Sequence, residues 1–132
     1  MDTQAVFEKG FQDMIALAGE SHFDACSRMA SDLTRSAVLY DYKEGVFITE
    51  VLEHAFFHMD FLLDDYDVPQ NDKKETVENA TKHLSELLSA YRNREKGRIC
   101  EILEDLQFIT TKFHTRCELR YAEKDQQARA DK

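Results

Sequence analysis

Glycine and proline are scarce in this chain, with four glycines and one proline among 132 residues. Turn-rich β proteins need these residues at many turns, so their scarcity favours long helices over strands. No run of about 18 apolar residues occurs, so we expect no membrane-spanning helix. The first ten residues also lack the basic and apolar regions of a signal peptide. These absences predict an all-α protein of the cytoplasm.

Cysteine is also rare, and the motifs of common catalytic sites are missing. Cys26, Cys100 and Cys117 are widely spaced and form no CxxC pair, which argues against a disulfide framework or a zinc ribbon. We expect all three to be buried, reduced thiols on apolar helix faces. Nucleophile elbows, phosphate loops and dinucleotide-binding glycine motifs are absent. The sequence therefore predicts no enzyme activity and no cofactor.

Positive charge is in deficit, because 17 Lys and Arg residues face 26 Asp and Glu residues, for a net charge of −9. Such a field repels phosphate backbones and anionic lipids, so nucleic acid and membrane surfaces are not expected partners. A basic protein partner is compatible with it. The 42% of hydrophobic residues is enough for a core, and the length suits one domain over 1–132.

Apolar residues recur at helical spacing along almost the whole chain. We predict an N-terminal helix within 1–19, a helical hairpin over 21–66, a second hairpin over 72–122 and a frayed tail over 123–132. Pro69 separates the hairpins, because proline lacks the amide that a helix needs. Three polar residues, each followed three positions later by an acidic one, are predicted helix caps: Ser21, Asp41 and Asp72.

The two hairpins match when the chain is slid by 51 residues. Eight identities coincide without a gap: Leu33–Leu84, Tyr40–Tyr91, Glu44–Glu95, Ile48–Ile99, Glu50–Glu101, Leu52–Leu103, Glu53–Glu104 and Phe57–Phe108. We interpret this register as the duplication of a helical hairpin, in which one copy covers the apolar face of the other. The predicted fold is an up-and-down bundle of about five helices. The second to fifth helices form a pseudo-symmetric four-helix bundle, and the first packs outside it or extends it.

The segment EHAFFHMD at 53–60 places His54 and His58 four residues apart, on one face of a helix. With Glu50 they define an alternative function, a metal-binding bundle. The segment resembles the HxxxH helix of hemerythrin-like bundles, but the other ligand motifs of that family are absent. The Glu-x-x-His pairs of di-iron bundles are absent as well. The preferred interpretation is no metal, with both histidines at the edge of the core and held by a hydrogen-bond partner.

One set of repeated residues points away from the predicted core, namely Glu50, Glu53 and Phe57 with their counterparts Glu101, Glu104 and Phe108. Three explanations stay open for these phenylalanines. The first helix and the tail cover them, they form a homodimer seam, or they dock a basic, apolar partner segment. We favour a non-enzymatic interaction module, such as an adaptor, a chaperone-like protein or an acidic antitoxin or immunity-type protein, that uses this acidic-aromatic face.

Overall fold

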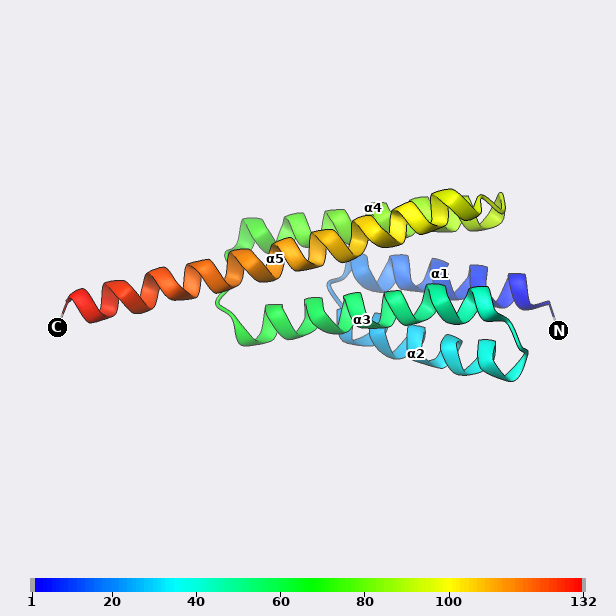
Figure 1. Ribbon diagram of the computed structural model, residues 1–132, viewed down its shortest axis with the longest axis horizontal. Coiled ribbons are helices and arrows are strands. Elements are labelled where there is room, and N and C mark those ends of the chain that lie inside the picture. Colours follow the sequence, from blue (N-terminus) through cyan, green and yellow to red (C-terminus); the bar gives the residue numbers. More distant parts are fainter. Residues whose placement is uncertain (1, 132) are drawn as a thin grey trace.

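Five helices account for nearly all of the chain in the computed structural model, which describes residues 2–131, and no strand occurs in that range (Figure 1). The helices run up and down: α1 (Thr3–Gly19), α2 (Phe23–Leu39), α3 (Lys43–Asp65), α4 (Gln70–Arg92) and α5 (Lys96–Ala130). The predicted all-α bundle is therefore confirmed. The predicted core faces are buried as well, since Leu52 and Leu103 are 0% and 1% exposed.

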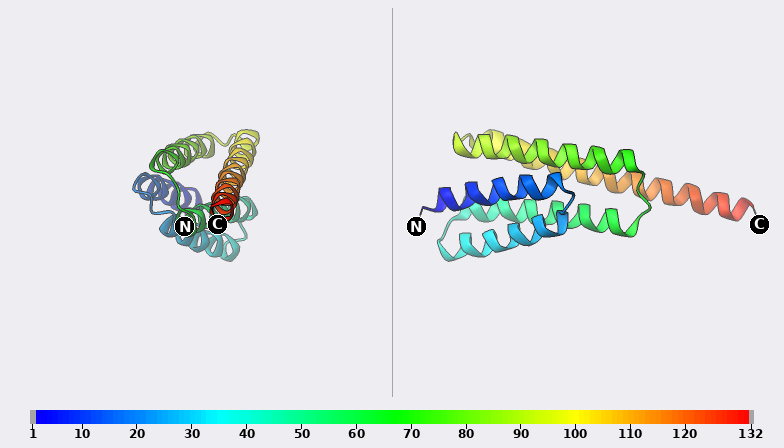
Figure 2. Two further views of the ribbon diagram at one scale, coloured as in Figure 1. Left: turned by 90° about the vertical axis from the view of Figure 1, so that its left-hand side faces the viewer. Right: turned by 180° about the vertical axis from the view of Figure 1, so that it is seen from behind.

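The first helix is part of the bundle wall, not an addition to it. Neighbouring helices contact one another in the ring order α1, α2, α3, α5, α4 and back to α1, as the end-on view of Figure 2 shows. On α1, Phe7, Phe11 and Met14 are completely buried. The expectation that this helix packs outside a four-helix bundle is wrong, because its apolar stripe fills the gap between α2 and α4.

The predicted caps at Ser21 and Asp41 are wrong, because both residues end the preceding helix. Each has a positive φ, of 63° and 53°, as does Arg94 at 56°. Backbone bonds close the helix ends around them: the His22 amide donates to the Leu17 carbonyl at 2.9 Å, and the Ser21 amide donates to the Ala18 carbonyl at 3.0 Å. This is a Schellman ending, in which a left-handed residue lets the chain reverse.

Asp72 does not cap α4 either, because Pro69 precedes its first turn as the cap residue. Asp72 lies within that turn and pairs with Arg120 of α5. Its negative charge still interacts favourably with the partial positive charge at the N-terminus of the helix. Acidic residues are therefore common near helix starts, which explains why the sequence pattern indicated a cap at this position.

The tail predicted to fray over 123–132 is instead helical as far as Ala130, and Lys132 lies outside the described residues. The last turns of α5 project beyond the other helices (Figure 1) and are exposed. Local forces account for this extension: Ala, Gln, Lys and Arg favour helix, and Arg129 pairs with Asp125 at 3.2 Å, one turn away. Lys124 also reaches Asp67 at 3.2 Å.

The structure does not show the internal duplication. The buried stripes agree with a shift of 51 residues, but the left-handed turn residues are Asp41 and Arg94, which lie 53 positions apart. Tyr40 and Tyr91 also differ in environment, with exposed fractions of 51% and 4%. Among the thiols, Cys26 and Cys117 are buried as expected, whereas Cys100 is exposed, so that prediction is wrong.

Candidate functional site: the outer face of α3 and its junction with α5

One row of side chains runs along the face of α3 that points away from the core. Its members recur at spacings of three or four residues: Glu50, Glu53, Phe57, Phe61 and Asp64. We call this set the α3 outer row. Phe57 is 66% exposed and Phe61 45%, and Phe47 at the start of the helix is 51% exposed. A helix that is apolar over much of its circumference thus leaves part of that surface to solvent.

The aromatic part of this face is hollowed. His54, Phe57, His58 and Phe61 together line a shallow depression. The two phenylalanines flank the two histidines because residues three and four apart lie on the same side of a helix. A partner side chain would meet aromatic rings and imidazole edges here.

Negative charge surrounds the depression. Between Lys43 and Asp65, α3 carries six acidic residues and only one lysine. The pKa of Asp60 is raised, first by partial burial and then by the nearby charges of Asp64 and Asp24. The nearby Arg28 acts in the opposite direction and lowers this pKa.

The explanation in which other parts of the chain cover Phe57 and Phe108 is wrong. α1 lies on the far side of the ring, between α2 and α4, and Phe57 remains two-thirds exposed. The end of α5 continues outward as a helix and leaves Phe108 69% exposed. A partner or a second copy of the chain remains as an explanation.

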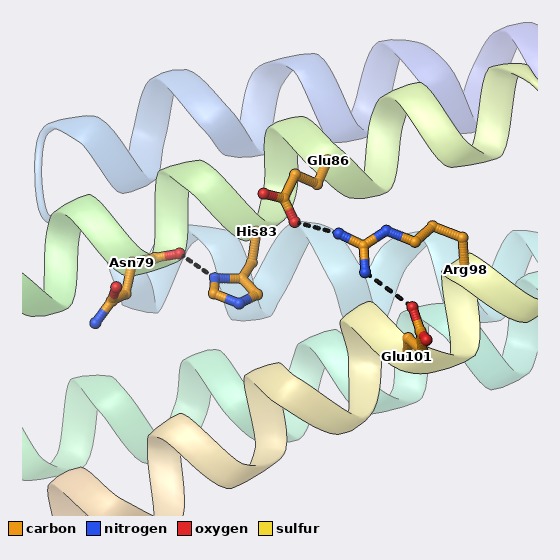
Figure 3. A network of polar contacts seen from close by, with 5 residues as sticks. All are labelled: Asn79, His83, Glu86, Arg98 and Glu101. Atoms are coloured by element: carbon orange, nitrogen blue, oxygen red, sulfur yellow. Dashed lines mark hydrogen bonds and ion pairs between the residues drawn. The ribbon is translucent and has the colours of Figure 1, made fainter.

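The second half of the predicted site is less acidic than its sequence indicates. Arg98 donates to Glu101 and to Glu86 of α4, at 2.9 Å each, and so joins α4 to α5 (Figure 3). Glu101 is therefore partly neutralised, while Glu104 is exposed near Phe108 on the outward face of α5. The structure brings Phe57, His54 and Phe61 into one depression, and Phe108 is not among its lining residues.

His83 shows how a histidine is held at the edge of the core. Its side chain is 9% exposed, and Nδ1 lies 2.7 Å from the Asn79 carbonyl oxygen, one turn earlier (Figure 3). A carbonyl oxygen only accepts, so Nδ1 carries the proton and donates. No role was predicted for His83 from the sequence, and its bond shows that an imidazole at the core boundary of this bundle can be satisfied by a backbone carbonyl.

A chain of polar contacts joins the C-terminal half of α3 to α5. His58 Nε2 lies 2.9 Å from His114 Nδ1, and the two rings are nearly perpendicular at 87°. His114 Nε2 lies 3.0 Å from a Glu118 oxygen, which also accepts a 2.7 Å bond from the Tyr66 hydroxyl. We call these four residues the histidine junction.

Protonation in the junction follows from its hydrogen bonds. The bonds from Tyr66 and His114 lower the pKa of Glu118, which keeps this carboxyl ionised and able only to accept. The same bond raises the pKa of Tyr66 to about 12. Burial, and then the charge of His114, lower the pKa of His58. The neutral arrangement therefore has His114 donating from Nε2 to Glu118 and accepting at Nδ1 from His58.

The alternative metal site of the sequence is not assembled as predicted. Among residues 2–131, no group of three or more His, Cys, Asp or Glu side chains is placed to hold a metal ion. His54 is exposed, so the prediction that it lies at the edge of the core is wrong. His58 does have a hydrogen-bond partner, because its ring turns toward His114 of α5. His114 was not a predicted site residue. The sequence did contain one indication of its role. His114 lies at the edge of the buried stripe of α5, as His58 lies at the edge of the buried stripe of α3.

Comparisons with known protein families, curated proteins and solved structures find no match to this chain. In the described part of the chain, no helix combines the length and apolar character that crossing a bilayer requires.

Proposed function

We propose that this protein is a non-enzymatic interaction module of the cytoplasm, in which the acidic-aromatic faces of α3 and α5 dock a basic, amphipathic helix of another protein. The docking residues are Glu50, Glu53 and Phe57 on α3 and Glu101, Glu104 and Phe108 on α5. Phe61 joins them because it lines the same depression as Phe57. An adaptor, a chaperone-like protein or an acidic antitoxin or immunity-type protein would use such a face.

The exposed phenylalanines carry this proposal. Full burial of a Phe side chain contributes roughly 2–3 kcal/mol, and the bundle leaves Phe57 and Phe108 two-thirds exposed while it buries Phe7, Phe11 and Phe56 completely. A partner that covers the outward rings recovers free energy that the isolated chain leaves unused. Scattered apolar residues are common on protein surfaces, but here Phe57 and Phe61 gather with His54 and His58 around one depression.

The chemistry of the partner follows from charge. Acidic positions of the α3 outer row, Glu50, Glu53 and Asp64, flank its phenylalanines at helical spacing. A partner helix with apolar residues along one side and Lys or Arg at its edges matches this pattern. Charge complementarity of this kind mainly speeds association and selects partners, so binding should weaken as salt rises.

The experiment is a titration of the protein with a synthetic 20-residue helical peptide that has leucine along one face and lysine elsewhere. Isothermal calorimetry should show one binding site. The Phe57→Ser/Phe108→Ser variant should bind about tenfold more weakly or worse, which corresponds to about 1.4 kcal/mol or more. Its far-UV circular dichroism should stay unchanged, because both rings are outside the core.

Two controls make the result specific. Leu39→Ser removes an apolar side chain that is 81% exposed on α2, outside the proposed face, and should leave binding intact. A peptide with glutamate in place of lysine should not bind. Wild-type affinity in the Phe57→Ser/Phe108→Ser variant would refute the proposal. Concentration-dependent dimerisation that this variant abolishes would instead assign the face to a homodimer seam.

A further inference from the structure

Two imidazole nitrogens from different helices face each other at the edge of the α3 outer face. His58 of α3 and His114 of α5 approach to 2.9 Å between Nε2 and Nδ1, with ring centroids 4.8 Å apart. A single proton lies between these nitrogens. Both rings are half-buried, so their positions are set by the packing of α3 against α5.

A metal ion could take the place of that proton with little movement. Two nitrogens bound to a tetrahedral zinc ion at about 2.0–2.1 Å stand about 3.3 Å apart, so the pair would open by about 0.4 Å. His114 already presents a bare Nδ1, because its proton is on Nε2 and points to Glu118. His58 needs only to move its proton from Nε2 to Nδ1, a change of tautomer.

Glu118 occupies the position of an outer ligand-orienting group. In metal sites, a coordinating histidine commonly donates its second ring N–H to a carboxylate, which fixes the tautomer and raises the basicity of the ring. Here Glu118 accepts from His114 at 3.0 Å and is itself held by the Tyr66 hydroxyl at 2.7 Å. This contact already exists without a metal.

A third imidazole lies on the same side of α3 as His58. His54 is one turn before His58 on α3, and both line the depression beside Phe57 and Phe61. Histidines four apart on a helix can bind one ion. The ring of His54 is exposed, so a change of rotamer can turn it toward His58. As the side chains stand, the three rings do not converge, which is consistent with the lack of a preformed three-ligand group among residues 2–131.

We propose that His54, His58 and His114 form a binding site for a borderline transition-metal ion such as Zn²⁺, Co²⁺ or Ni²⁺, with Glu118 as the positioning residue for His114. Three imidazoles suit this class of metals, in contrast to the oxygen ligands that Mg²⁺ and Ca²⁺ prefer. A fourth position would remain open to water. The site does not depend on the proposed docking function, since no phenylalanine takes part in it.

The test is a titration of the untagged protein with Zn²⁺ alone, followed by calorimetry. Parallel spectra with Co²⁺ report ligand geometry directly. Expected results are one ion per chain and the visible absorption bands of tetrahedral Co²⁺. His54→Ala, His58→Ala and His114→Ala should each weaken binding by about tenfold or more, and Glu118→Gln should weaken it by a similar or smaller factor.

His22→Ala is the matched control, because His22 is an exposed histidine at the α1–α2 turn, outside the junction. It should bind Zn²⁺ like the wild-type protein. Equal losses in His22→Ala and His114→Ala would overturn the site as adventitious surface binding. Wild-type affinity in His54→Ala or in His114→Ala would overturn the three-imidazole assignment, as would the absence of binding by the wild-type protein. Circular dichroism of each variant verifies that the fold is retained, and the half-buried rings make unfolding by these substitutions unexpected.

Discussion

The position of α1 within the bundle wall predicts that Phe11→Ala is strongly destabilising. Phe11 is completely buried, and its ring contacts Tyr91 edge to face at 5.1 Å and Phe7 at 6.2 Å between centroids. Truncation of a buried Phe to Ala costs about 3–5 kcal/mol, through lost burial and the cavity left behind. Domains of this size are typically stable by about 5–15 kcal/mol, so the variant should still fold, with a much lower urea midpoint.

The assay is urea denaturation followed by far-UV circular dichroism, with the free energy of unfolding obtained by linear extrapolation. Phe57→Ala is the matched control, since it removes the same ring from a position that is 66% exposed. We expect it to change the free energy by about 0.5 kcal/mol or less. Equal effects of the two substitutions, or a loss below about 1 kcal/mol for Phe11→Ala, would refute the argument that α1 completes the core.

Further predictions concern close packing and alkaline pH. At Gly45 an added Cβ would lie 2.5 Å from Tyr42 Cδ2 and 3.0 Å from Phe7 Cε1, so Gly45→Ala should lower stability by about 1–3 kcal/mol in urea denaturation. Gly97→Ala should instead raise it by about 0.5 kcal/mol, because nothing lies within 4 Å of the added atom; destabilisation by both substitutions would contradict the packing described at Gly45. Burial, and then the bond to Tyr42, raise the pKa of the Tyr91 hydroxyl. A raised folded-state pKa means that the stabilising contribution is intact below about pH 10 and is lost as pH rises further. Thermal melting from pH 8 to pH 11 should therefore show an alkaline decline that is smaller in Tyr91→Phe, and identical declines would rule out Tyr91 as its source.

The helical fold was predictable from the sequence, because hydrophobic periodicity and the scarcity of glycine and proline act on local structure. The buried stripe of α5, from Ile99 through Leu103 to Cys117, follows from spacing alone, as does the outward position of Phe57. The roles of the residues in the turns between helices were harder to predict. A polar residue such as Ser21 suits both an N-cap and a left-handed C-terminal position, and only the backbone path distinguishes the two.

The candidate site was predictable in part. Helical geometry placed Glu50, Glu53 and Phe57 on one outward face, and the structure keeps Phe57 there. The pairing of His58 with His114 was not predictable, because no local rule relates positions 56 residues apart. The neutralisation of Glu101 by Arg98, which also holds Glu86 on α4, required knowledge of which helices are neighbours.

The amino-acid sequence alone determined the helices, their apolar stripes and the acidic character of the chain. These properties depend on residues within a few turns of one another, or on composition. The tertiary structure decided that α1 completes the ring, that Phe57 and Phe108 stay uncovered and that His58 meets His114. The physical reason is that packing chooses among several pairings of similar amphipathic helices, and the choice depends on how all five stripes are buried together.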